Sequence, residues 1–238
     1  MKQLIEIPQS LKDIHLDSFI QFVKMPQDDE RLLKYKAFKL FLGMDKKLVD
    51  ALNFDQSQVF MNEVSEVLTN KPSQQLTFEI DGVKYGRIPN LDAITFGEYY
   101  DLDGFITPAF EGEIKHEEAF RFMAVMYRPI VEEVQGLYKI AKYTANEDWL
   151  IMKKAPTNAY LDTVSFFLTL RSELLKHLKI YLEEEAATIP ALNLAKVGAG
   201  MEALTTSLKE ISSSTTKSQN SHFRKSLLNC YLINKIEN

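Results

Sequence analysis

The amino-acid sequence predicts an α+β fold that is mainly α-helical, with a small antiparallel β-hairpin region in the middle of the chain. Apolar residues recur at helical spacing in the first third of the chain and again over a long segment beginning near residue 157. Asp81-Gly82 separates two segments with alternating apolar residues, a strong signal for a two-residue hairpin turn. Six of the nine glycines fall between Gly82 and Gly136 and indicate short elements there.

The first third of the chain predicts four helices. Ser10 is a suitable N-cap for the first helix, and Asp55 is suitable for the fourth. Gly43 is expected to stop the second helix, because glycine readily adopts the left-handed conformation that ends helices. The expected ranges are 11–23, 29–42, 46–53 and 55–69.

The hairpin insert, residues 76–88, predicts its own register. The expected pairs on one face are Ile80 with Val83, Phe78 with Tyr85 and Leu76 with Arg87. On the other face Glu79 is opposite Lys84, which predicts a cross-strand ion pair. The first face is largely apolar, so we expect it to cover another part of the protein.

Short elements are expected between this hairpin and the long helix. Residues 91–100 indicate a short helix, followed by a loop to Gly112. Residues 116–128 indicate a helix that Pro129 ends. Residues 130–143 fit either a second hairpin with its turn at Gln135-Gly136 or a helix broken at that point, and the apolar spacing does not decide between them.

The longest predicted helix runs from Thr157 to about Glu185. Its apolar stripe is Tyr160, Val164, Phe167, Leu174, Leu178 and Tyr181, widened by Leu161, Leu168, Leu175 and Leu182. Charged residues such as Asp162 and Arg171 exclude a membrane span, so we expect the stripe to pack against protein. We expect it to pack on the core of the same chain, with a partner subunit as the alternative. Residues 1–187 would then form a mainly helical globular domain.

Residues 188–238 predict a polar, flexible segment followed by an amphipathic helix. The stretch from Thr205 to Ser221 is too poor in apolar residues to pack well. From His222 to Ile236, Phe223, Leu227 and Tyr231 stand at helical spacing. Docking of this helix on the body and capture by a partner are both consistent with the pattern.

Composition excludes several classes of protein. The net charge of −5 and the isoelectric point near 5.5 give no general attraction for nucleic acid or an anionic membrane. The single cysteine, Cys230, cannot form an intramolecular disulfide, which fits a reducing cytoplasm. No stretch approaches the roughly 18 consecutive apolar residues that span a bilayer. We therefore expect no membrane association.

The sequence predicts no catalytic, cofactor-binding or metal-ligating residues. Asp92, Glu98, Asp101 and Asp103 provide carboxylates in one segment, but the spacing lacks the glutamate that completes a calcium-binding loop. The four histidines are scattered, and no phosphate-binding glycine motif or nucleophile motif is present. A solvated acidic segment is the simpler interpretation.

Four segments resemble a known group of proteins: KQLIEIPQSLKDIHLDSFIQFV, VKYGRIPNLDAITFGEYYDLD, FRFMAVMYRPI and SFFLTLRSELLKHLKIYLEE. They are similar to a family encoded among the virion genes of tailed bacteriophages, including crAss-like phages of Bacteroidetes hosts. The resemblance implies a structural or tail-assembly-chaperone-like role, and it brings no catalytic residues. The chain departs from the family pattern at Arg87 and Arg171.

Our first hypothesis is a non-enzymatic phage protein that acts through protein-protein contacts in virion assembly. The expected partners are other virion or assembly proteins, or a second copy in a homo-oligomer, in the host cytoplasm during assembly or in the virion. The expected contact residues are Tyr85, Arg87, Tyr99, Tyr100, Phe223, Leu227 and Tyr231. The alternatives are a metal-dependent enzyme that uses the acidic segment 92–103, and a nucleic-acid-binding phage regulator that uses the basic tail.

Overall fold

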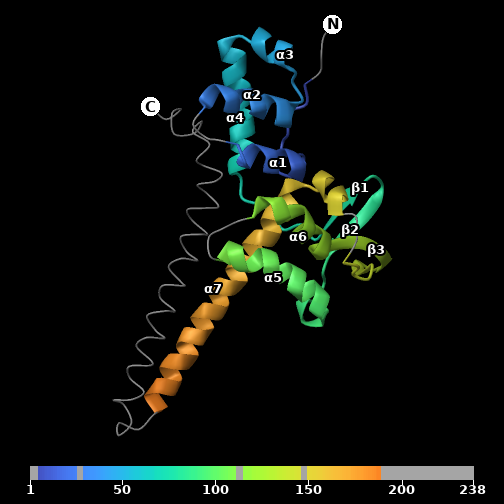
Figure 1. Ribbon diagram of the computed structural model, residues 1–238, viewed down its shortest axis with the longest axis vertical. Coiled ribbons are helices and arrows are strands. Elements are labelled where there is room, and N and C mark those ends of the chain that lie inside the picture. The colour runs from blue at the N-terminus through green and yellow to red at the C-terminus, as the bar shows by residue number, and fades with distance from the viewer. Residues whose placement is uncertain (1–4, 26–28, 111–114, 146–148, 189–238) are drawn as a thin grey trace.

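The protein combines helices with one antiparallel sheet (Figure 1), as the computed structural model shows for residues 5–25, 29–110, 115–145 and 149–188. The α-helices are α1 (Leu16–Val23), α2 (Glu30–Leu42), α3 (Lys46–Ala51), α4 (Phe54–Thr69), α5 (Phe96–Phe110), α6 (Ala119–Met126) and α7 (Thr157–Thr188). The 3-10 helices are η1 (Leu91–Ala93), η2 (His116–Glu118) and η3 (Trp149–Lys154). The strands are β1 (Thr77–Ile80), β2 (Val83–Arg87), β3 (Tyr127–Val134) and β4 (Leu137–Ile140). The predicted α+β, mainly helical class is confirmed.

Local capping explains the starts of α2, α3 and α4. Asp29 accepts a hydrogen bond from the Leu32 amide at the start of α2, and Gly43 ends that helix with φ of 63°. Asn53 and Gln56 form a capping box that starts α4 at Phe54, so the predicted cap at Asp55 was wrong by two residues.

The first helix begins later than the sequence suggested. The carboxylate of Asp13 accepts hydrogen bonds from the amides of Gln9 and Ser10, which closes a separate turn. The chain then runs beside the start of α7, where the Leu16 amide donates to the Ala155 carbonyl at 2.8 Å. This tertiary contact fixes the start of α1, and Ser10 does not cap it.

The sheet has four antiparallel strands in the order β1-β2-β3-β4. The predicted hairpin is confirmed, because Phe78 pairs with Tyr85 and Ile80 with Val83. The second hairpin joins β3 to β4 through Gln135 and Gly136, whose φ angles are 52° and 81°. The two hairpins pair through β2 and β3, so the hairpin insert is half of a larger sheet.

Two predictions in the middle of the chain were wrong. The helix expected over 91–100 is η1 followed by α5, which continues to Phe110 through the expected loop and includes Pro108. The helix expected to end at Arg128 ends at Met126, and Pro129 lies inside β3 opposite Tyr85. Glu79 lies opposite Lys84 as predicted, but the ion pair that Lys84 forms, at 2.7 Å, is with Glu133 on β3.

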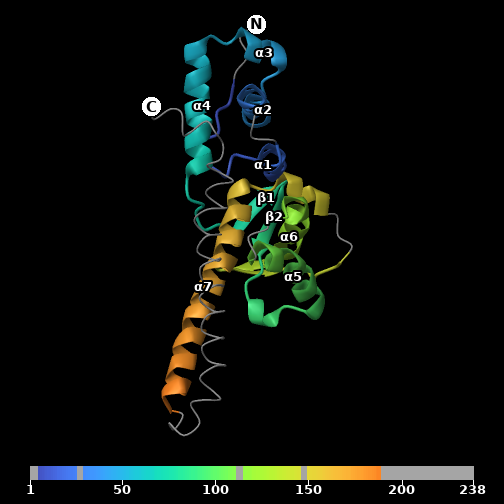
Figure 2. The same ribbon diagram turned by 60° about the vertical axis from the view of Figure 1, so that its left-hand side comes forward.

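The core is one cluster of buried residues to which every long helix and the sheet contribute. Helix α6 lies at its centre and buries seven of its eight residues. Among the described side chains of α7, those in the core belong to its first half, and Leu168 is the last of them. Figures 1 and 2 both show the second half of α7 extending beyond the described remainder of the chain. Residues 189–238, including the predicted amphipathic helix, lie outside the described residues.

Candidate protein-interaction site

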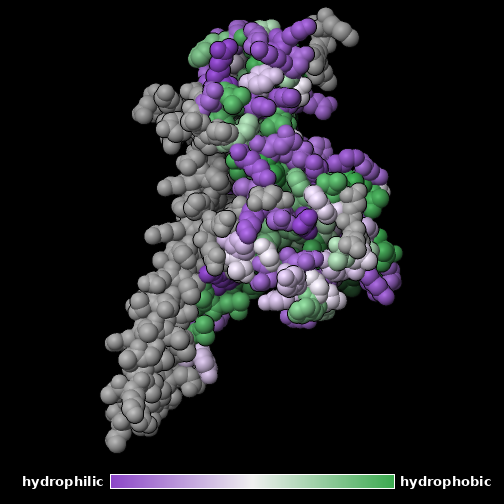
Figure 3. Space-filling view, in the orientation of Figure 1, coloured by the Kyte–Doolittle hydropathy of each residue, from purple (hydrophilic) through white to green (hydrophobic). Residues whose placement is uncertain are grey.

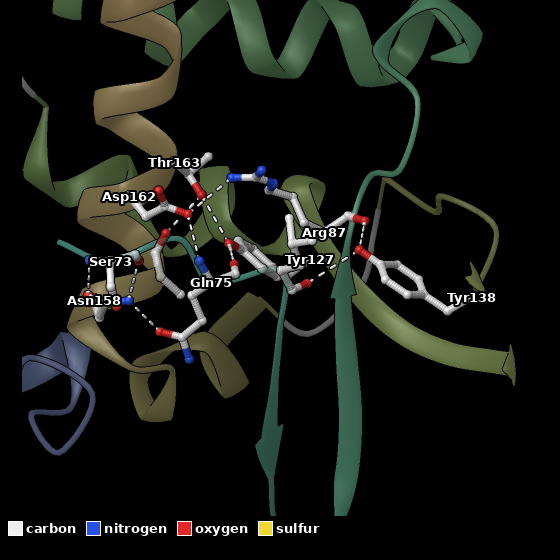
Figure 4. Close-up of polar contacts among 10 residues, drawn as sticks. Ser73, Gln75, Arg87, Tyr127, Tyr138, Asn158, Asp162 and Thr163 are labelled. Atoms are coloured by element: carbon white, nitrogen blue, oxygen red, sulfur yellow. Dashed lines mark hydrogen bonds and ion pairs between the residues drawn. The ribbon is translucent and has the colours of Figure 1, made fainter. Parts of the chain in front are cut away.

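The first half of α7 is fixed to the sheet by a group of polar contacts (Figure 4). Asn158 Nδ2 donates to the Ser73 carbonyl at 2.8 Å and to Gln75 Oε1 at 2.7 Å, while its Oδ1 accepts from the Ser73 amide at 2.9 Å. One turn later, Asp162 Oδ2 accepts from the Gln75 amide at 2.9 Å and from Arg87 Nη1 at 3.2 Å. Two α7 side chains therefore hold the chain that leads into β1, and one of them also holds β2.

Tyr127 completes these contacts from β3. Its hydroxyl donates to the Gln75 carbonyl at 2.6 Å and lies 3.2 Å from Thr163 Oγ1. Burial raises the pKa of Tyr127 to about 12, so the ring stays neutral at physiological pH. Tyr138 on β4 donates its hydroxyl to the Arg87 carbonyl at 2.9 Å.

We call this group of residues the α7 anchor: Ser73, Gln75, Arg87, Tyr127, Tyr138, Asn158, Asp162 and Thr163. Tyr127, Asn158 and Thr163 are buried, and the other members are partly buried or exposed. Buried polar groups stabilise a fold when each finds a partner, as these three do. The group has no nucleophile paired with a base, so its chemistry is that of a structural clamp.

Beyond the anchor, α7 carries a row of exposed apolar side chains. We call it the arm stripe: Phe166, Leu170, Leu174, Leu178 and Tyr181. Spacing of three and four residues places them along one side of the helix. Leu174, Leu178 and Tyr181 are 61%, 44% and 57% exposed. Figure 3 shows hydrophobic residues on α7 where it leaves the body.

The arm stripe overlaps the stripe that the sequence predicted. Tyr160 and Val164, its first members, are buried in the core as expected. Leu174, Leu178 and Tyr181 continue at the same spacing after the body ends. The sequence therefore predicted a continuous apolar stripe. It did not show at which residue the stripe leaves the core and becomes exposed.

Helix α5 presents a second exposed apolar surface. Thr95 and Glu98 form a capping box: the Thr95 amide donates to Glu98 Oε2 at 2.6 Å and the Glu98 amide to Thr95 Oγ1 at 3.3 Å. The other Glu98 oxygen pairs with Arg128 Nη2 at 2.5 Å, and both side chains are buried. Burial favours the neutral form of Glu98, but the Thr95 hydrogen bonds and the Arg128 charge prevail and lower its pKa. With Glu98 turned inward, Tyr99 and Tyr100 face outward.

Three of the four carboxylates of the alternative enzyme hypothesis have other partners, and the fourth, Asp92, is exposed. Glu98 is occupied by Arg128 and Thr95, Asp101 accepts the Tyr143 hydroxyl, and Asp103 accepts the Thr107 hydroxyl at 2.8 Å. Among the described residues, no group of three or more potential ligands is positioned to hold a metal ion.

The predicted contact residues divide into three groups. Tyr85 is buried, and Arg87 is held by Asp162, so neither offers an open surface to a partner. Tyr99 and Tyr100 are 55% and 69% exposed, and their contact role remains a prediction. Phe223, Leu227 and Tyr231 lie outside the described residues.

No helix in the described ranges combines the length and the apolar character needed to cross a membrane. Comparison of the chain with protein-family models, with curated proteins and with solved structures found no match. The fold and these two surfaces therefore identify the chain only as an α+β protein with an anchored, projecting helix.

Proposed function

We propose that this protein is a non-enzymatic assembly protein that acts through protein-protein contacts, with the arm stripe of α7 as its main contact surface. The observation that carries the proposal is the change in burial along one continuous helix. Leu161 and Leu168 are buried, whereas Leu174 is 61% exposed. Burying a large apolar side chain contributes about 1.5–3 kcal/mol, so covering the stripe provides a substantial driving force for association.

The α7 anchor supports this proposal because it makes the projecting half rigid at its base. A helix that is fixed before binding loses less conformational freedom when it meets a partner. Arg87, which pairs with Asp162, also lies over the Phe166 ring at 5.3 Å. The first residue of the arm stripe is thus held by the anchor itself.

The proposed setting is the assembly of a tailed-bacteriophage virion, and the support for it is the resemblance of the four sequence segments described above. The partners would then be other virion or assembly proteins. The protein would act in the host cytoplasm, and it would either leave or stay in the mature particle.

The experiment is co-purification from infected cells with substitutions on α7. Leu174→Asp combined with Leu178→Asp introduces charge into the stripe at exposed positions, where it leaves folding intact. Thr169→Asp is the matched control, since Thr169 is exposed on another side of the same helix. We expect the double variant to lose its virion-protein partners and the control to keep them. Equal recovery of partners by both variants would contradict the proposal.

A further inference from the structure

The solvent side of α5 is aromatic. Phe96, Tyr99 and Tyr100 are 81%, 55% and 69% exposed, and Asp103 follows one turn later on the same side. The ring centroids of Phe96 and Tyr100 lie 6.4 Å apart. We call these four residues the α5 face. The opposite side of the helix is buried in the core, so α5 is apolar on both sides, which is typical of a helix that is covered in its working state.

The surroundings of the α5 face are acidic. Residues 88–110 contain four aspartates and glutamates and no lysine, arginine or histidine. Glu98 is neutralised by Arg128, but Asp92, Asp101 and Asp103 are exposed. This charge opposes nucleic acid and anionic lipid, and it attracts a cationic polypeptide.

A cavity adjoins the α5 face. Tyr100 and Asp101 line it, and its volume is about 740 Å³. The apolar part of its wall includes Phe105, Phe122 and Trp149. Its charged lining is balanced, with Lys115 and Arg121 beside Asp101 and Glu118, so the cavity suits an uncharged side chain and the net negative charge lies on the α5 face. A pocket of this kind beside exposed tyrosines can receive one apolar side chain of a bound segment, in the manner of interface hot spots.

We propose that the α5 face binds a cationic segment of a partner protein. An arginine or lysine of that segment lies over the ring of Tyr99 or Tyr100 and pairs with Asp103, and a neighbouring apolar side chain enters the cavity. Tyrosine faces attract cations, and arginine combines this contact with hydrogen bonds to carboxylates. The surface is on a different helix from the arm stripe, so this inference and the proposed function can fail separately.

The test uses the full chain and a capped hexapeptide of alternating arginine and leucine, with the glutamate-leucine hexapeptide as its counterpart. Trp149 is the single tryptophan of the chain and lines the cavity, so its fluorescence reports binding beside calorimetry. We expect the arginine peptide to bind at low salt and binding to weaken as salt is added. No binding at about 1 mM peptide in low salt, or equal binding of the glutamate peptide, would overturn the inference.

Three variants locate the binding. Tyr99→Ser combined with Tyr100→Ser should lower the affinity for the arginine peptide about tenfold, because each cation-aromatic contact contributes about 0.5–1 kcal/mol. Asp92→Asn combined with Asp103→Asn should lower the same affinity about fivefold. Glu63→Gln with Glu66→Gln removes the same charge from exposed positions of α4 and should change binding less than twofold. Equal weakening by the α4 control would overturn the inference. So would a concentration-dependent dimer that the tyrosine variant abolishes, because a second copy would then be the occupant.

Discussion

Arg87 on β2 and Asp162 on α7 form an ion pair with Nη1 and Oδ2 3.2 Å apart, although 75 residues separate them in the chain. Their side chains are only 12% and 16% exposed. The same Asp162 oxygen accepts from the Gln75 amide. One carboxylate thus joins α7, β2 and the segment that leads into β1.

Asp162→Asn should destabilise the protein by about 2–4 kcal/mol, because it leaves the Arg87 guanidinium largely buried without its counter-charge. Urea denaturation followed by circular dichroism measures the free energy of unfolding. Lys139→Gln is the control: it breaks an ion pair with Glu132 whose side chains are 73% and 54% exposed, so the expected loss is below about 0.5 kcal/mol. Similar losses for both variants would show that the Asp162 contact is no stronger than a surface pair.

Gly86→Ala and Gly104→Ala should change stability in opposite directions. A Cβ at Gly86 would lie 2.5 Å from Cε2 of Tyr138, whose hydroxyl is held by the Arg87 carbonyl. We expect a loss of about 1–3 kcal/mol there. A Cβ at Gly104, within α5, meets no atom within 4 Å, and helix propensity predicts a gain of about 0.5–1 kcal/mol. Thermal melting of the two variants checks the pair, and a stabilising Gly86→Ala would refute the close approach of Tyr138.

Glu98→Gln should alter the pH dependence of stability. The pKa of Glu98 is lowered in the folded state, so its contribution is present above the ordinary glutamate pKa and is lost as the pH falls through the folded value. At pH 7 the variant should be less stable by about 2–4 kcal/mol, because Arg128 loses its buried partner. The difference from the unsubstituted protein should narrow as the pH falls below about 4. Urea denaturation at several pH values measures it, and a difference independent of pH would show that the Glu98 charge does not stabilise the fold.

Tyr160→Phe should leave stability unchanged or raise it by about 1 kcal/mol. The Tyr160 side chain is buried, and its hydroxyl has no hydrogen-bond partner among the described residues. Removing the oxygen therefore removes a desolvation cost. Chemical denaturation measures the change, and a loss above about 1 kcal/mol would show that the hydroxyl is bonded.

The parts of the fold that depend on local geometry were predictable. Asp81-Gly82 predicted the register of the first hairpin correctly. The start of α5 was also accessible, since Thr95 and Glu98 have the spacing of a capping box. Its second half was not, because Gly104 and Pro108 favoured the loop that was expected up to Gly112.

Tertiary contacts explain the parts that were not predictable. Tyr127 continues the apolar pattern of α6, yet Tyr127 and Arg128 pair with β2 as part of a strand. Lys84 on β2 has a glutamate on each neighbouring strand, and it forms its ion pair with Glu133 on β3. The arm stripe depends on where the body ends beneath α7, which apolar spacing does not encode.

A photo-crosslinking amino acid at position 174, compared with the same group at position 169 during infection, tests the central claim most directly. If the arm stripe is the contact surface, position 174 will crosslink to a specific virion or assembly protein, and position 169 will not. Identical crosslinks from the two positions, or crosslinks from position 174 only within its own chain, would contradict the account.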